Sequence, residues 1–224
     1  MLHDDSSWQA MWRGLQAAHP EPQLHGALLQ RYTEPHRKYH SAQHLLACLV
    51  HFELLRDQAE REHEVQVALW FHDAVYEIGR SDNELRSAEW ARSALRAAGA
   101  TEPCAQRVFD LVMVTRHDVA PRTRDQQVLL DIDLSILGQP DAVFDEYERQ
   151  VTDEFASVAP AQRRVRRSQI LQQFLDRPRL YHTERFFDLF ETQARANLAR
   201  SIRQLGVSAQ ADAMCRVEAR PTNP

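Results

Sequence analysis

The stretch VLLDIDLSIL, residues 128–137, decides the fold class of this chain. Its apolar and polar side chains alternate, and a two-residue period is typical of a β-strand. A partner strand is hard to find, because Gly is rare, with 6 residues, and no Asn-Gly or Asp-Gly dipeptide marks a hairpin turn. A lone strand would leave its backbone N–H and C=O groups unpaired, so hydrogen bonding favours a helix here. The chain is therefore predicted to be all-α.

Apolar residues recur at helical spacing through most of the remaining chain. Helices are expected over residues 6–18, 22–33, 42–59, 62–76, 82–98, 103–116, 125–137, 141–157, 160–175 and 184–205. Ser41 and Asp82 stand directly before two of these segments, where their side chains suit N-caps. We predict one domain over residues 1–206, of roughly nine to ten helices. Residues 207–224 have no apolar stripe and are expected to form a loose tail.

Composition places the chain among globular proteins. Hydrophobic residues make up 43% and charged residues 26% of the 224 residues, which argues against wholesale disorder. No apolar run reaches the roughly 20 residues that cross a bilayer, and the start MLHDDSSWQAMW does not resemble a signal peptide. The 3 cysteines are widely spaced and suggest neither a disulfide framework nor a cysteine zinc site. A cytoplasmic protein with no membrane partner is expected.

The charge balance bears on possible partners. The formal net charge of -5 weighs against nonspecific nucleic-acid binding, which depends on a basic surface. One local exception is QRRVRRSQ, residues 162–169, with four arginines at positions 163, 164, 166 and 167. We interpret this run as the solvated face of a helix among acidic neighbours. No nucleic-acid partner is expected.

A histidine and a carboxylate lie side by side in the apolar stretch LWFHDAVYE, residues 69–77. Burying His72 and Asp73 without partners would cost several kcal/mol. Upstream, His40 and His44 are four residues apart and can face a common space, and Asp133 follows downstream. Imidazole nitrogen and carboxylate oxygen suit divalent metals, and a cation would offset the cost of burying the carboxylates. From the residues alone, a metal site and ordinary packing remain equally favoured.

Five motifs in this order resemble the HD superfamily of metal-dependent phosphohydrolases. They are YHSAQH at 39–44, LWFHDAVYE at 69–77, DNELRSAEW at 82–90, DIDLSILG at 131–138 and RLYHTERFFDLFETQARANL at 179–198. The last is similar to the C-terminal part of a bacterial branch of small single-domain members, so the resemblance covers about residues 8–205. It implies an HD-domain helical bundle.

The resemblance also implies a set of metal ligands. The superfamily pattern H…HD…D matches His44, His72, Asp73 and Asp133. These residues are expected to bind one divalent ion, which the sequence leaves open among Mn, Mg, Fe, Co, Ni and Zn. Cyclic-nucleotide phosphodiesterases are similar around YHSAQH and IDLSI. That similarity favours His40 as general acid, and it favours Asp133 over Asp131 as a ligand.

Other roles follow from the resemblance or from position. Asp82 and Glu84 are expected to orient water or to support the catalytic site. Arg37, Lys38 and His117 are expected to contact the substrate.

Two residues of the C-terminal motif and three aromatic residues near the HD pair are given no catalytic role. Arg195 and Asn197 match the pattern of the bacterial branch without a mechanistic function. Trp70, Phe71 and Tyr76 are interpreted as core, because large aromatic residues at helical spacing usually pack inside.

The expected function is hydrolysis of a phosphate ester. A divalent ion makes water nucleophilic near neutral pH, and a small phosphorylated molecule, including a nucleotide, would be the substrate. One alternative is a non-catalytic HD module that binds a nucleotide. A di-iron oxygenase is less favoured, because only His117 lies between the HD pair and the final Asp133, and two-metal members generally have more histidines there.

Overall fold

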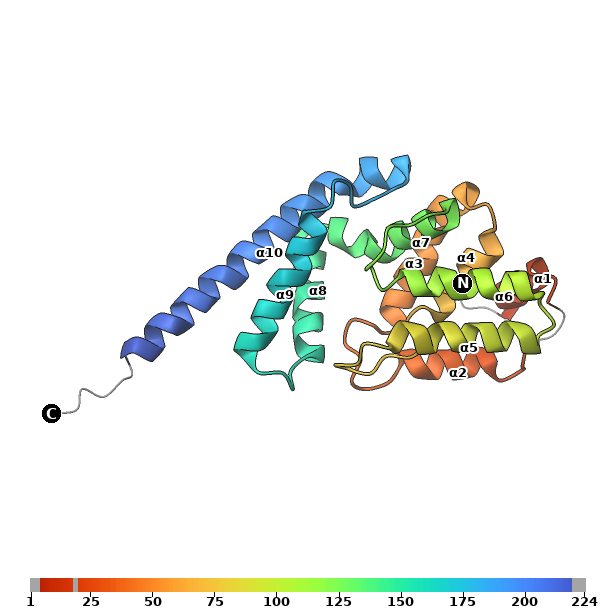
Figure 1. Ribbon diagram of the computed structural model, residues 1–224, viewed down its shortest axis with the longest axis horizontal. Helices are drawn as coiled ribbons and strands as arrows, with labels where there is room; N and C mark the ends of the chain where they lie inside the picture. Colours follow the sequence, from red (N-terminus) through yellow and green to blue (C-terminus); the bar gives the residue numbers. More distant parts are fainter. Residues whose placement is uncertain (1–4, 18–19, 219–224) are drawn as a thin grey trace.

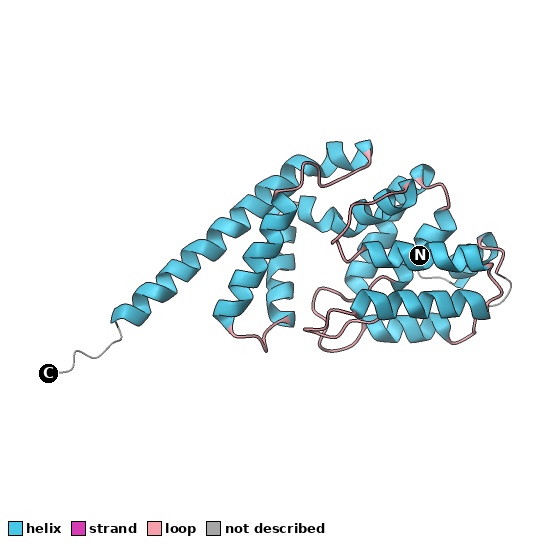
Figure 2. Ribbon diagram, viewed as in Figure 1, coloured by secondary structure: helices cyan, strands magenta, loops and turns pink. Residues whose placement is uncertain are grey.

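The computed structural model describes residues 5–17 and 20–218, and the regular elements among them are all helices (Figure 2). The α-helices are α1 Asp5–Gly14, α2 Leu24–Tyr32, α3 Ala42–Leu55, α4 Glu62–Phe71, α5 Asn83–Ala97, α6 Glu102–Val114, α7 Arg124–Asp133, α8 Asp141–Glu154, α9 Pro160–Leu175 and α10 Glu184–Glu218. Two 3-10 helices are η1 Arg56–Gln58 and η2 Leu134–Gly138. The all-α prediction is confirmed.

The segment 128–137 forms the end of α7 and most of η2, as the hydrogen-bonding argument predicted. The carboxylates of Asp131 and Asp133 point to opposite sides of the helix, because side chains two residues apart on a helix diverge by about 200°. Asp131 is fully buried and accepts hydrogen bonds from the backbone N–H groups of His182 and Thr183. Asp133 lines a cleft on the other side.

The helices form two groups that meet along α7 and η2 (Figure 1). Helices α1 to α7 make up the larger group. Helices α8, α9 and α10 make up the smaller one, in which ion pairs join α8 to α9 through Arg167 and Glu148 and α8 to α10 through Arg200 and Asp145. One cluster of buried apolar side chains extends from Trp8 on α1 to Leu198 on α10. The candidate site described below lies where the two groups face each other.

Helix α10 extends away from the rest of the molecule (Figure 1). It runs to Glu218, so the backbone of residues 207–218, for which the sequence predicts a loose tail, continues the helix. These residues include neither Pro nor Gly and are rich in good helix formers, so the helix propagates. Residues 219–224 of the predicted tail lie outside the described residues. Within the described ranges no helix has the length and apolar character needed to cross a bilayer.

The helix starts follow local capping chemistry only in part. The Thr101 hydroxyl accepts a hydrogen bond from a backbone N–H at the start of α6, and Thr123 does the same for α7. Ser41 and Asp82 occupy the N-cap positions of α3 and α5, but their side chains make no capping hydrogen bond. The Asp82 carboxylate pairs instead with Arg80 at 2.7 Å. The predicted side-chain caps are therefore wrong for these two helices.

Asn197 and Arg195 connect α10 to the segments beside it. The Asn197 amide is fully buried and donates to the carbonyls of Leu137 and Gln139, at 2.9 and 2.8 Å. The Arg195 guanidinium donates to Glu191 and to three carbonyls at the end of α9 and in the loop that follows it. These contacts give both residues a structural role.

Replacing Asn197 by leucine should destabilise the fold by about 2–4 kcal/mol, because two hydrogen-bonded carbonyls, one of them deeply buried, lose their donor. Urea unfolding followed by circular dichroism would measure the loss. Thr192→Ala, at an exposed position of the same helix, should change the stability by less than about 0.5 kcal/mol. Equal stability of the two variants would contradict this role of Asn197.

Candidate metal centre

Helix α4 ends at Phe71, five residues before the predicted end at 76, and this early end shapes the site. The chain turns at His72 and Asp73, and His72 itself keeps helical backbone angles, with φ -54° and ψ -39°. Although neighbours on a helix diverge by about 100°, His72 Nε2 and Asp73 Oδ2 lie 3.2 Å apart. The Arg37 guanidinium donates to the backbone carbonyls of Asp73 and Ala74, at 2.6 and 3.2 Å. It also donates to the His40 carbonyl at 3.1 Å and so connects the turn to the start of α3.

The side chains of His44, His72, Asp73 and Asp133 converge from α3, this turn and the end of α7. His44 Nε2 lies 3.1 Å from His72 Nε2 and 3.6 Å from Asp73 Oδ2. His72 Nε2 lies 3.2 Å from the same Asp73 oxygen. Asp133 Oδ1 lies 3.3 Å from His44 Nε2 and 3.7 Å from His72 Nε2. Four groups from three separate segments of the sequence thus point their polar atoms at one small volume.

The tautomer of His72 follows from its backbone contact. Its ring is 1% exposed, and Nδ1 lies 2.7 Å from the Leu69 carbonyl, to which it can only donate. Nε2 is then the atom that faces His44, and two imidazole nitrogens 3.1 Å apart need a proton or a cation between them. Histidine ligands of metal ions usually have this second hydrogen bond, which orients the ring.

His72 and the carboxylates of this cluster shift one another's pKa values. Burial by itself lowers the pKa of His72, but the Asp73 and Asp133 carboxylates raise it to about 9. Burial raises the pKa of Asp73, yet the imidazoles of His72 and His40 hold it well below its usual range. The two carboxylates therefore stay ionised and attract a positive charge into the cluster.

A buried group of His44, Cys48, His72 and Asp133 offers one ligand atom each, all within 4.8 Å of one another, and could hold a metal ion. Sequence analysis missed Cys48, which lies one turn after His44 on α3. Its sulfur is 3.7 and 3.8 Å from the two ring nitrogens of His44, so it packs against the imidazole face. Burial and the nearby carboxylates raise the pKa of the Cys48 thiol well above its ordinary value, which favours the neutral form.

His117 follows α6 and lies beside the cluster. Its Nε2 is 3.0 Å from Asp133 Oδ2, and its buried Nδ1 has no hydrogen-bond partner. Its backbone φ of 58° is unusual for a residue other than glycine, and Arg177 holds its carbonyl at 2.8 Å. The contact with Asp133 places His117 where it can touch an ion or a substrate in the cleft.

His40 is held by a carboxylate that sequence analysis did not find. Glu154, at the end of α8, has a fully buried side chain and accepts the backbone N–H groups of Lys38, Tyr39 and His40 on Oε1, at 2.8–2.9 Å. Its Oε2 lies 2.7 Å from His40 Nδ1 and 3.0 Å from the Tyr76 hydroxyl. Nδ1 of His40 is thereby occupied, and Nε2 remains as the atom available to a ligand.

The hydrogen bonds to Glu154 predict a loss of stability in acid. Burial raises the pKa of Glu154, but His40 and the backbone N–H groups lower it to about 2 from 4.5. Because the pKa of Glu154 is lower in the folded than in the unfolded state, its ionisation stabilises the fold by about 3 kcal/mol at pH values above 4.5. This stabilisation is lost as the pH falls from about 4.5 toward 2. In chelator-treated protein, the stability difference between wild type and Glu154→Gln should therefore shrink between about pH 6 and pH 3. A difference that is independent of pH would contradict this.

Two adjoining cavities lie on one side of this cluster, and only the first is lined by cluster residues. A cleft of about 360 Å³ is lined by Asp73, Asp133 and His117, and a second cavity of about 440 Å³ lies next to it. His40, Tyr76, Glu84, Tyr147 and Ile170 line both.

The two cavities locate several predicted site residues. Glu84 lines both cavities. Asp82 lines neither cavity and is ion-paired to Arg80. Arg37 and Lys38 also line neither, and the ammonium of Lys38 donates to the Pro35 carbonyl. The structure thus gives Arg37 a positioning role in place of a substrate contact.

Two interpretations of nearby residues are corrected. Trp70 and Phe71 are core residues, but Tyr76 lines both cavities and is stacked on His40 with ring centroids 4.2 Å apart. The arginine run is not simply a solvated face. The Arg167 side chain is only 13% exposed and is ion-paired to Glu148. Packing of α9 against α8 and α10 buries this position, which the local charge pattern cannot reveal.

Comparison of the chain with family models, with curated proteins and with solved structures found no match in any of the three.

Proposed function

We propose that this protein is a metal-dependent phosphohydrolase of the HD type, with His44, His72, Asp73 and Asp133 as ligands of one divalent ion. The observation that carries the proposal is the spacing of their polar atoms, 3.1–3.7 Å for the pairs above. Ligands about 2.1 Å from one ion lie roughly 3.0–3.5 Å apart when they meet at octahedral or tetrahedral angles. The donor set and its spacing therefore suit such an ion.

The bound ion would supply Lewis-acid activation of water and of the phosphoryl oxygen. Around it, the chain provides the proton chemistry. His40 lines the cleft next to Asp73, and its protonated ring can give a proton to the leaving oxygen as the P–O bond breaks. Glu154 holds the opposite nitrogen of that ring at 2.7 Å and so directs Nε2 to the reaction. Glu154 is thus a positioning residue, and His40 is the proposed general acid.

The remaining residues of the cleft suit a small anionic substrate. His117 and Arg177 line the same cleft as the ligand cluster, and they can donate hydrogen bonds to phosphate oxygens. In the described part of the chain the Glu84 carboxylate makes no hydrogen bond or ion pair with another residue, and burial raises its pKa. It is available to orient water or a hydroxyl group of the substrate. A phosphate ester of a small molecule fits this arrangement.

The direct test is the metal content of the purified protein together with phosphate release from a panel of nucleotides and sugar phosphates. We expect one divalent ion per chain and metal-dependent release from at least one compound. One ion with saturable nucleotide binding and no release would indicate a non-catalytic module. Two irons with oxygen consumption would indicate an oxygenase, and both results would refute the proposed hydrolase.

A further inference from the structure

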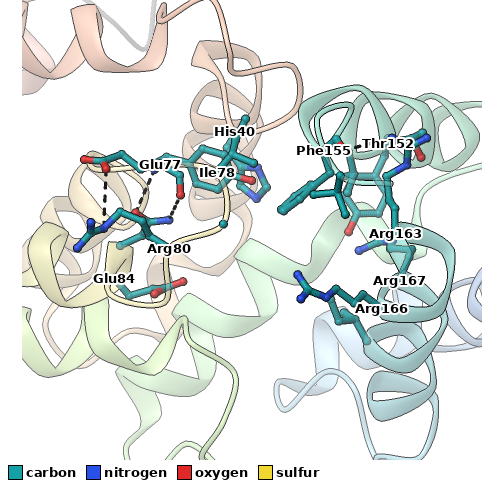
Figure 3. Close-up of a pocket in the computed structure, with 17 residues that line it drawn as sticks. His40, Glu77, Ile78, Arg80, Glu84, Thr152, Phe155, Arg163, Arg166 and Arg167 are labelled. Atoms are coloured by element: carbon teal, nitrogen blue, oxygen red, sulfur yellow. Dashed lines mark hydrogen bonds and ion pairs between the residues drawn. The ribbon is translucent and has the colours of Figure 1, made fainter. Parts of the chain in front are cut away.

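The second cavity, called here the side chamber, lies between the loop after the HD pair, the start of α5 and the helices α8 and α9 (Figure 3). Its volume of about 440 Å³ is within the range of small-molecule sites. Apolar side chains make up much of its wall, namely Ile78, Val151, Phe155, Val158 and Ile170. The proposed reaction does not by itself require such a space.

His40 connects the side chamber to the reaction cleft. It lines both spaces, as do Tyr76 and Glu84. During hydrolysis a bond forms between the water oxygen and phosphorus, the bond to the leaving oxygen breaks, and the proton of His40 passes to that oxygen. Because phosphorus lies at the metal cluster in this scheme, the leaving group extends past His40 into the side chamber.

The side chamber carries positive charge that the protein leaves unpaired. Arg163 and Arg166 line it from α9, and neither is ion-paired within the described residues. Arg163 donates one hydrogen bond, to the Phe155 carbonyl at 3.1 Å. By contrast, the other two arginines of the wall, Arg167 and Arg80, are paired with carboxylates.

Figure 3 places Arg163 and Arg166 on the α9 side, opposite Glu84 and His40. Two carboxylates also line the side chamber. Glu77 is ion-paired to Arg86, and Glu84 lies on the side shared with the reaction cleft. The free positive charge is therefore at the α9 wall, across the apolar space from His40. Arginine there can bind a phosphate or carboxylate group through paired N–H donors.

We propose that the side chamber binds a leaving group that carries a second anionic group, held by Arg163 and Arg166. The substrate class is then a phosphate ester with two anionic groups joined by an apolar or aromatic body, such as a nucleoside bisphosphate. This inference rests on the proposed hydrolase, since it uses the direction from the metal cluster past His40.

The test compares adenosine 3′,5′-bisphosphate with the 3′- and 5′-monophosphates as substrates. The proteins are wild type, Arg166→Gln, the Arg163→Gln/Arg166→Gln double variant and Arg122→Gln, which removes an exposed arginine outside the side chamber. We expect wild type to prefer the bisphosphate in kcat/KM. The preference should fall at least about tenfold in the double variant, mainly through KM, and persist in Arg122→Gln.

Each outcome separates the inference from the proposed function. Phosphate release without preference for the bisphosphate, or with equal preference in all four proteins, would overturn the inference and leave the hydrolase intact. If no compound is hydrolysed, the proposed hydrolase function is refuted. Equilibrium dialysis of the bisphosphate then tests separately whether the side chamber binds an anion. Binding to wild type at least about tenfold tighter than to the double variant supports it, and equal or absent binding overturns it.

Discussion

Replacing Asp73 by alanine should abolish metal retention and reduce phosphate release by about a thousandfold or more. The carboxylate lies 3.2 Å from His72 Nε2 and 3.6 Å from His44 Nε2, so its loss removes one of four converging donors and one of the two negative charges. A metal ion contributes several kcal/mol of transition-state stabilisation, which corresponds to a change of this size. Metal analysis after gel filtration and a phosphate-release assay measure both effects.

The matched control is Asp110→Ala, which removes an exposed carboxylate on α6. It should keep the metal and the activity. Circular dichroism of both variants would establish that each is folded, and His44→Ala provides a second variant in the same cluster. If Asp73→Ala kept its metal and its turnover, the assignment of this metal centre would be wrong.

Replacing His40 by glutamine should lower kcat by about 10²–10³-fold while the metal content stays unchanged. His40 lines the cleft but is not one of the four proposed ligands, and its Nδ1 is held by Glu154, so its loss affects proton transfer and leaves the ion in place. Atomic absorption and steady-state kinetics on the same samples separate the two effects. Loss of metal in this variant would instead assign His40 to the metal site.

Glu154→Gln tests the positioning role through pH. Burial lowers the pKa of His40, but the hydrogen bond that its ring donates to Glu154 and the charge of Asp73 more than offset this, and the pKa is raised overall. Activity needs the protonated ring and should fall as the pH rises through that pKa. Removing the Glu154 charge lowers the pKa, so the basic limb of the kcat profile should move to lower pH.

Tyr76→Phe is the control for Glu154→Gln. It removes the 3.0 Å hydrogen bond to Glu154 and leaves the carboxylate in place, so the basic limb should stay close to that of wild type. A purely structural role of Glu154 would lower the activity of Glu154→Gln without moving the limb.

Sequence reasoning predicted the helices well because their signals are local. Apolar spacing located ten helical segments, and hydrogen-bond accounting resolved 128–137 as helix. The end of α4 was misplaced, since the turn at His72 and Asp73 depends on Arg37, which binds it from the loop before α3. Helix ends of this kind depend on distant contacts and carry no clear local signal.

By itself, the sequence determined that the chain is helical, because apolar spacing is a local signal. The resemblance of its motifs to the HD superfamily singled out His44, His72, Asp73 and Asp133 as candidate ligands. Only the tertiary structure showed that their polar atoms converge. It alone brought Glu154 to His40 and the arginines of α9 to the side chamber. These partners are far apart in sequence, and the packing of α8 and α9 against the other helices decides which of their side chains meet.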